Sequence, residues 1–276
     1  MAPARANTDG KEGMETPPPI FDAQLHPGGL TDQDLESIRL FGVTAALVPA
    51  HHFPPATARG VMDHFDNIVE RQLPRLEKAG IRAYAALGVH PRCVPRRGLP
   101  EVMARLPSYF QGGKVVAVGG IGLHDATPEE EEAFTEQVAL ARRLKLPVVV
   151  QTPTKDKERV TRRTLSLLRE AGIKPATVLV DRASGRTVRL ILECGHHAGL
   201  TLHPDDLTAE RAAALIRKLG SERLVLDTHA GDGAGDILAL ARLARLLAKG
   251  KLSEPVVARV CLRNGLGFFR LTGAEP

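Results

Sequence analysis

The sequence of 276 residues contains no tryptophan, and aromatic residues make up only 4% of it. A surface that stacks nucleic-acid bases would therefore have few aromatic rings to use. Cysteine is also scarce, with Cys93, Cys194 and Cys261 far apart and odd in number. This pattern argues against a disulfide framework and predicts a reducing, cytoplasmic environment. We expect Cys194, which follows an apolar run, to be buried.

Long apolar runs are absent as well. No stretch approaches the roughly 18 consecutive apolar residues of a membrane span, so we expect no membrane association. The motifs GxSxG, P-loop, HExxH and EF-hand are missing, which excludes the hydrolase and calcium-binding classes that depend on them. Residues 1–18 are polar, rich in Pro and Gly, and lack the apolar core of a signal peptide. We expect them to form a disordered tail and residues 19–276 to form one domain.

The net charge is +5 and the isoelectric point is near 9.3, but Lys and Arg are spread along the chain instead of forming one block. This distribution favours acidic partners weakly and does not by itself indicate nucleic acid.

Strand-like and helix-like segments alternate eight times between residue 20 and about residue 250. Helix starts are marked at Thr31 and at Thr127-Pro128, and glycines follow several of the amphipathic stretches. Eight β-then-α units predict a single (β/α)8 TIM barrel, an α/β fold. A doubly wound sheet is the alternative, but GGIG at 119–122 does not have the spacing of a dinucleotide-binding turn. The predicted strands are 20–26, 43–49, 82–89, 114–121, 147–151, 177–181, 198–203 and 222–228.

Histidines gather where these strands end. Seven of the ten in the chain follow a predicted strand: His26, His51, His52, His90, His124, His203 and His229. In a barrel, the carboxyl ends of the strands surround the active-site mouth. Imidazoles at that rim predict a polar pocket, with a metal site as one form of it.

Several segments carry a family resemblance, in the right order from residue 20 to residue 272. They include DAQLH at 22–26, GVHP at 88–91, VAVGGIG at 116–122, LPVVVQTP at 146–153, RLVLDTHA at 223–230 and RNGLGFF at 263–269. Together they resemble the TatD-type metal-dependent hydrolases, and most closely a branch of predicted metal-dependent hydrolases with a TIM-barrel fold.

The resemblance implies a set of metal ligands, most of which are replaced here. The family's HxH pair falls on Gln24 and His26, and its strand-four glutamate on Gly120. Its strand-five and strand-six histidines correspond to Gln151 and Arg182, and its strand-eight aspartate to His229 or Gly231. Glycine offers no ligand, and a guanidinium would repel a nearby cation. We therefore expect two metal ions not to be held as the family holds them.

Three functional hypotheses follow. The first is a pseudoenzyme without two-metal hydrolysis and without a cofactor, which binds a small anionic ligand or a protein partner at the mouth. Its pocket would include Gln24, His90, Gln151, Arg182 and His203, with Lys155 and Lys157 beside Arg182 as anion-binding groups.

The second hypothesis is a rewired hydrolase of phosphodiester or other ester or amide substrates. It would hold one divalent ion (Zn, Mn or Ni) on His26, His124 and His229, with Asp227 as a further ligand or catalytic group. Asp22 and Asp181 would then orient the imidazoles. The third hypothesis, nucleic-acid binding without catalysis, has the least support from the residues.

Overall fold

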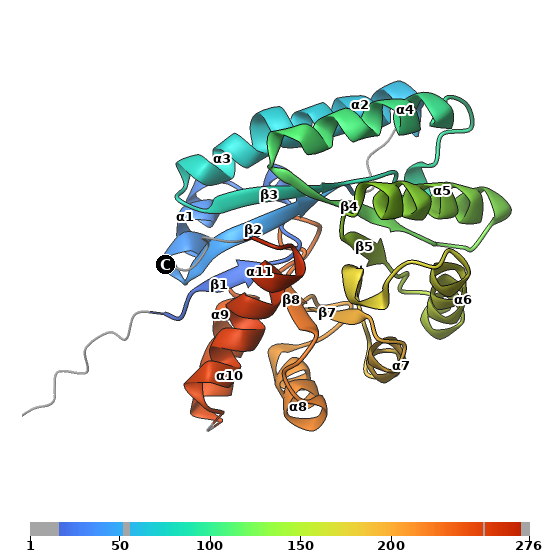
Figure 1. Ribbon diagram of the computed structural model, residues 1–276. Helices are drawn as coiled ribbons and strands as arrows, with labels where there is room; N and C mark the ends of the chain where they lie inside the picture. Colours follow the sequence, from blue (N-terminus) through green and yellow to red (C-terminus); the bar gives the residue numbers. More distant parts are fainter. Residues whose placement is uncertain (1–16, 52–55, 251, 272–276) are drawn as a thin grey trace, which may run out of the picture.

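Eight parallel strands form one sheet in which every strand pairs with the next along the chain (Figure 1). The computed structural model describes residues 17–51, 56–250 and 252–271. Of the predicted tail at 1–18, residues 1–16 lie outside the described residues. His52 also lies outside them. The strands are β1 (Ile20–Asp22), β2 (Val43–Pro49), β3 (Arg82–Leu87), β4 (Val115–Gly122), β5 (Val148–Gln151), β6 (Val178–Val180), β7 (His197–Thr201) and β8 (Leu224–Asp227).

The first and last strands meet, so the sheet is nearly closed into a barrel. The Ala23 N–H donates to Leu226 O at 3.0 Å, and the His229 N–H donates to Gln24 O at 2.9 Å. The predicted TIM barrel is thus confirmed, with each strand within a few residues of its predicted position. The strands are recognisable because both of their faces are buried, which selects nearly continuous apolar, β-branched runs.

Helices surround the sheet and connect successive strands (Figure 1). Threonine caps begin four of them, because the side chains of Thr31, Thr57, Thr127 and Thr208 accept backbone N–H groups of the first turn. Short 3-10 turns lie at Pro27–Gly29, Pro91–Cys93, Phe110–Gly112 and Pro175–Thr177, and π-helical turns lie at Ile68–Gln72 and Arg259–Arg263. The α-helices are α1 (Asp32–Leu40), α2 (Ala58–Asn67), α3 (Leu73–Lys78), α4 (Leu99–Tyr109), α5 (Pro128–Leu144), α6 (Lys157–Glu170), α7 (Val188–Glu193), α8 (Ala209–Leu219), α9 (Ala239–Lys249), α10 (Glu254–Ala258) and α11 (Asn264–Phe268).

The C-terminal segment covers one end of the barrel. Leu262 and Leu266 pack with Phe21 and the small alanines of the barrel interior. Asn264 donates hydrogen bonds to the carbonyls of Ser221 and Leu224, at the start of β8. Helix α11 therefore lies at the amino-terminal ends of the strands, and the opposite end remains for a functional site.

No helix among the described residues is both long enough and apolar enough to cross a bilayer. The three cysteines are unbridged; Cys93 and Cys261 are buried. The expectation that Cys194 is buried is wrong: it follows α7 on the outer surface and is exposed.

Candidate metal centre and cavity

A cavity of about 240 Å³ opens at the carboxyl ends of the strands. The rim predicted from the histidines is therefore hollow and polar. The residues that line it come from seven of the eight strand ends and the loops that follow them: His26, His51, His90, Pro91, Arg92, Leu123, His124, Gln151, Thr152, Pro153, Thr154, Arg182, His229 and Asp232.

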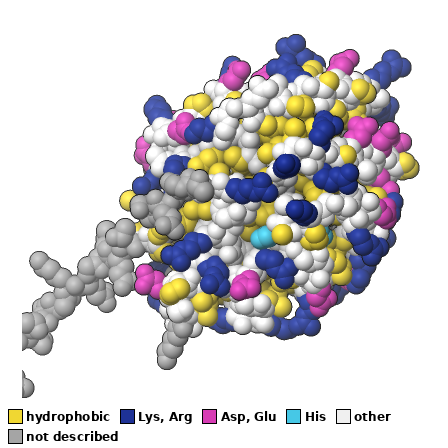
Figure 2. All heavy atoms as spheres, viewed as in Figure 1, with side chains coloured by type: hydrophobic (Ala, Val, Ile, Leu, Met, Phe, Trp, Pro, Cys, Tyr) yellow, Lys and Arg dark blue, Asp and Glu magenta, His cyan; other side chains and the backbone are white. Residues whose placement is uncertain are grey.

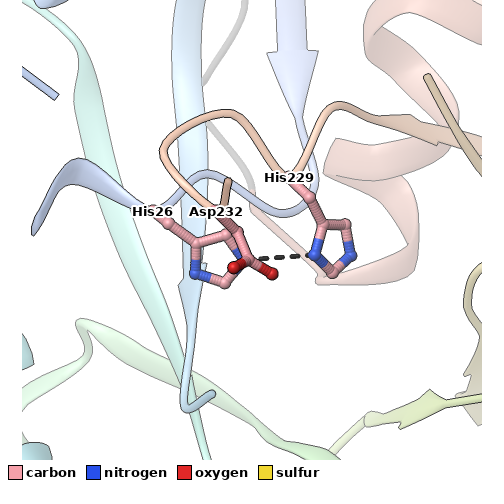
Figure 3. Close-up of side chains that lie close together, drawn as sticks. All are labelled: His26, His229 and Asp232. Atoms are coloured by element: carbon pink, nitrogen blue, oxygen red, sulfur yellow. Dashed lines mark hydrogen bonds between the residues drawn. The ribbon is translucent and has the colours of Figure 1, made fainter. Parts of the chain in front are cut away.

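Two histidines and one aspartate form a compact group at this cavity. His26 follows β1, whereas His229 and Asp232 lie in the loop after β8. Figure 3 shows the two imidazole rings facing each other, with the Asp232 carboxylate beside His26. His26 Nε2 lies 3.2 Å from His229 Nδ1. One ligand atom from each of the three residues lies within 4.8 Å of the others, so a single cation could contact all three.

The second ring nitrogen of His229 contacts a buried aspartate. His229 Nε2 lies 3.0 Å from Asp181 Oδ2, and Asp227 Oδ1 is farther away at 3.8 Å. Burial acts to raise the pKa of Asp181, but the hydrogen bond to His229 and its charge outweigh burial and keep that pKa below its ordinary value. An ionised Asp181 can only accept, so Nε2 carries a proton, and in the neutral form of the ring Nδ1 then presents its lone pair to the cavity. This is the arrangement by which carboxylates orient metal-binding histidines.

Asp227 is fully buried and is not among the residues that line the cavity. Neither of its carboxylate oxygens has a hydrogen-bond partner among the described residues. Burial, followed by the negative charge of Asp181, raises the pKa of Asp227 well above its ordinary value. Asp227 thus lies outside the cavity lining, where it forms a second group of close ligand atoms with Asp181 and His229.

Asp22 differs from its expected role of orienting an imidazole. Its carboxylate accepts from Thr228 Oγ1 at 2.6 Å and from the backbone N–H groups of Thr228 and Gln24 at 3.1 Å. Burial raises the pKa of Asp22 to about 6, against the opposing effect of the Thr228 hydrogen bond. Asp22 therefore joins β1 to the loop after β8 and supports His229 indirectly.

Four imidazoles form a row that begins with His229 and His26 and continues through His51 to His64. His26 contacts His51 with ring centroids 4.7 Å apart, and His51 contacts His64 of α2 at 4.5 Å. Burial, and then the charge of His51, lowers the pKa of His26 well below its ordinary value. The same causes lower the pKa of His64 to about 3. Both rings are therefore neutral at physiological pH, which is the form that binds metals.

The positions where the resemblance implies other ligands are occupied differently. Gln151 Nε2 donates to Gln24 Oε1 at 2.8 Å, so the two amides bind each other. At Gly120 the backbone φ is +26°, and a Cβ atom would lie 1.9 Å from Ala50 O. The register between β4 and β5 shifts at this residue, which forms a β-bulge. No side chain can replace Gly120 without movement of the backbone.

Some of the remaining predicted residues line the cavity and others do not. His90, His124 and Arg182 line the cavity with Gln151. His124 does not belong to either group of close ligand atoms found among the described residues, which are His26, His229 and Asp232, and Asp181, Asp227 and His229. Its role as a metal ligand stays a prediction. Its loop is held by Glu130, whose carboxylate accepts three consecutive backbone N–H groups of residues 124–126.

His203 is not among the residues that line the cavity, and its place in a binding pocket stays a prediction. Its Nδ1 accepts from the Asp205 N–H, and its Nε2 lies 3.3 Å from Asp232 O. Asp232 was not predicted as a site residue. Its only signal in the sequence is a carboxylate three residues after His229 in a glycine-rich loop, and that signal is weak.

Comparisons with known proteins agree with this architecture. A family model described as TatD related DNase matches residues 28–234. The chain belongs to the TatD family. It is 31% identical over 254 residues to an uncharacterized metal-dependent hydrolase of Methanocaldococcus jannaschii, a match covering 91% of this chain and 100% of the relative.

Solved structures of TatD proteins share the fold. A TatD-like protein from Archaeoglobus fulgidus superposes with a TM-score of 0.76 and 28% identity, covering 91% of this chain and 100% of the other. A TatD homologue from Escherichia coli has a TM-score of 0.67 and 23% identity over 91% and 98% of the two chains. The resemblance inferred from the sequence is thereby confirmed.

Proposed function

We propose that this TatD protein is a metal-dependent hydrolase that uses one divalent ion, held by His26, His229 and Asp232. The observation that carries the proposal is the pair of imidazole nitrogens 3.2 Å apart, one of them oriented by Asp181. Two nitrogens bound to one tetrahedral zinc ion at ~2.0–2.1 Å would lie about 3.3–3.4 Å apart. Two imidazoles and one carboxylate form a donor set suited to Zn, and also to Mn or Ni.

The rest of the cavity supports one ion instead of two. Gln24 and Gln151 bind each other, Gly120 has no side chain, and Arg182 brings a fixed positive charge. In their place, His229 provides an imidazole where the resemblance implies an aspartate. The ligands that the resemblance implies at Gly120, Gln151 and Arg182 are missing. The proposed single site is formed instead by residues that follow β1 and β8.

A divalent ion bound there would supply Lewis-acid activation of water and of the scissile group. The chain's own residues have other tasks. Asp181 holds the proton of His229 at Nε2, so that Nδ1 remains a ligand. His90 and His124 line the cavity beside the proposed ion, where a bound substrate would contact them.

Metal content tests the proposal directly. Protein purified without a histidine tag should contain close to one equivalent of Zn, Mn or Ni by inductively coupled plasma mass spectrometry. His26→Ala and His229→Ala should each lose it. His124→Ala, which changes a cavity residue outside the two ligand groups, should retain it. Hydrolysis of model phosphodiester and carboxylic ester substrates should be lost together with the metal in His26→Ala and His229→Ala.

The same experiment addresses the pseudoenzyme, which is supported by the direct contacts between His26 and His229 and between Gln24 and Gln151. Wild-type protein that binds no ion, even in buffer supplemented with Zn or Mn, would overturn the hydrolase. Nucleic-acid binding without catalysis has less support. On the face that Figure 2 shows, Lys and Arg side chains are distributed among acidic ones and form no single stripe.

A further inference from the structure

Arg182 has an unusual backbone and a constrained side chain. It follows β6 and Asp181, and it lines the same cavity as His26 and His229. Its φ is +56°, in the left-handed region that a long side chain rarely adopts. Such a conformation is strained and persists when the surrounding structure fixes it. One short segment thus delivers both the carboxylate that orients His229 and a guanidinium at the cavity.

Three neighbouring residues fix this guanidinium and its backbone. Arg182 Nη2 lies 2.7 Å from Asp206 Oδ2. Lys157 Nζ donates to Asp206 Oδ1 at 3.0 Å and to the Arg182 carbonyl at 2.7 Å. Thr152 Oγ1 donates to the carbonyl of Asp181 at 2.8 Å. The side chains are only 15% exposed for Arg182, 14% for Lys157 and 3% for Asp206, so the group is held in the protein.

The charges of this group do not cancel. Two cations share one carboxylate, which leaves a net charge of +1. Arg182 Nε is buried and has no hydrogen-bond partner among the described residues. Among the described residues that line the cavity, only Asp232 is acidic, and it belongs to the proposed metal group. A guanidinium stays protonated at any physiological pH, so Arg182 presents a fixed positive charge that would attract an anion into the cavity.

We propose that Arg182 is the residue that binds an oxyanion of the substrate, a phosphate or carboxylate group, and that Asp206 and Lys157 position it. The inference rests on the proposed hydrolase function, because it names the substrate class for that cavity. Lys157 is thereby a positioning residue and not a direct anion ligand, since its ammonium group is occupied by Asp206 and the Arg182 carbonyl. The guanidinium offers N–H donors in a planar fork, the geometry that suits carboxylate and phosphate.

Calorimetric titration with inorganic phosphate and, separately, with acetate tests the proposal on the full chain. Arg182→Gln should weaken binding of the preferred anion at least tenfold, because a charge-assisted pair is lost. Arg182→Lys should lose less, because lysine keeps the charge but not the fork. Arg186→Gln is the matched control: Arg186 lies in the same loop, is exposed and does not line the cavity, so affinity should not change. The anion that binds more tightly identifies the substrate group.

Two results would overturn the assignment: wild-type protein that binds neither anion, or Arg182→Gln that binds as tightly as wild type. The titration is repeated on His26→Ala, which the proposed function expects to be metal-free. Arg182 should still bind the anion there, and the metal content of Arg182→Gln should equal that of wild type. Failure of the metal site and failure of the anion site are therefore separable.

Asp206→Asn tests the positioning role. This substitution makes the group more positive, so attraction of charge alone would tighten anion binding. Loss of positioning should instead weaken it several-fold, and tighter binding would contradict the role of Asp206. Thermal melting checks that the variant folds, and Asp206→Glu, which keeps the carboxylate, should recover part of the affinity.

Discussion

His229 connects most of the proposed site. Its φ of +51° places it in the left-handed region, a strained position for a residue other than glycine. Its backbone N–H binds Gln24 O, one ring nitrogen faces His26, and the other faces Asp181. Hydrogen bonds to residues that follow β1 and β6 hold His229 in this conformation, so the imidazole is fixed before any ion or substrate binds. Such preorganisation is what a metal ligand requires.

The bond between Asp181 and His229 leads to a prediction at this scale. Asp181→Asn should lower metal affinity ~10–100-fold, because the amide no longer holds the proton on Nε2 and Nδ1 is less available as a ligand. Competition with a fluorescent zinc chelator measures the affinity. Asp227→Asn is the matched control: Asp227 Oδ1 is 3.8 Å from Nε2, beyond hydrogen-bond distance, so affinity should change less than about threefold. Equal losses in the two variants would contradict the assignment.

Sequence patterns located the histidines but not their directions. Period-two alternation holds within a strand, whereas most of these residues lie one to three positions beyond it. The His203 ring therefore contacts backbone atoms of Asp205 and Asp232. His124 lines the cavity but belongs to neither ligand group among the described residues. The sequence indicated Arg182 both as a charge that repels a cation and as an anion-binding group, but not its partnership with Asp206, which spans two separate loops. Such pairings depend on tertiary structure that local patterns do not contain.

Strand β4 illustrates the same limit at the scale of an element. Its apolar run predicts a strand correctly, but the bulge at Gly120 follows from contact with the end of β2. In the sequence, Gly120 stands where the resemblance implies a glutamate. In the structure, the backbone at Gly120 lies so close to Ala50 O that no side chain fits. Restoring a carboxylate there would displace β2 or β4 before it supplied a ligand.

Gly120→Ala should therefore destabilise the protein by about 2–4 kcal/mol, from the clash and the left-handed backbone combined. Urea unfolding followed by circular dichroism measures the loss. Gly185→Ala serves as control, because a Cβ atom there meets nothing within 4 Å and its φ is not positive. The control should stay within about 0.5 kcal/mol of wild type. A Gly120→Ala variant as stable as the control would show that the bulge yields easily.

In the whole molecule, stability and function are separated along the barrel axis. The C-terminal segment packs Leu262, Leu266 and Phe269 against the interior at the amino-terminal ends of the strands. The polar groups gather at the opposite ends, where buried carboxylates and imidazoles replace apolar packing. The alternation of segments suffices to predict this overall arrangement, because eight β/α units have few other ways to bury both faces of their strands.

His197 gives a test of stability at the C-terminal-segment end, far from the proposed site. It begins β7, its ring lies 4.8 Å from that of Phe268, and its Nδ1 is buried without a hydrogen-bond partner among the described residues. Burial, followed by the charges of Arg223 and His196, lowers the pKa of His197 from 6.5 to about 4. Between these two values the unfolded chain binds more protons than the folded one, so stability falls as pH falls through that window.

From pH 7 to pH 5, a fully buried group with this shift would cost ~2 kcal/mol, and partial exposure reduces the expected cost to about 1 kcal/mol. His197→Phe keeps the aromatic contact but cannot titrate. The free energy of unfolding in urea should thus fall by about 1 kcal/mol less in this variant than in wild type over the same range. Above pH 7 the two proteins should show parallel pH dependence, because His197 is then neutral in both states. Identical losses between pH 7 and pH 5 would mean that the folded barrel accepts the proton at His197 without penalty.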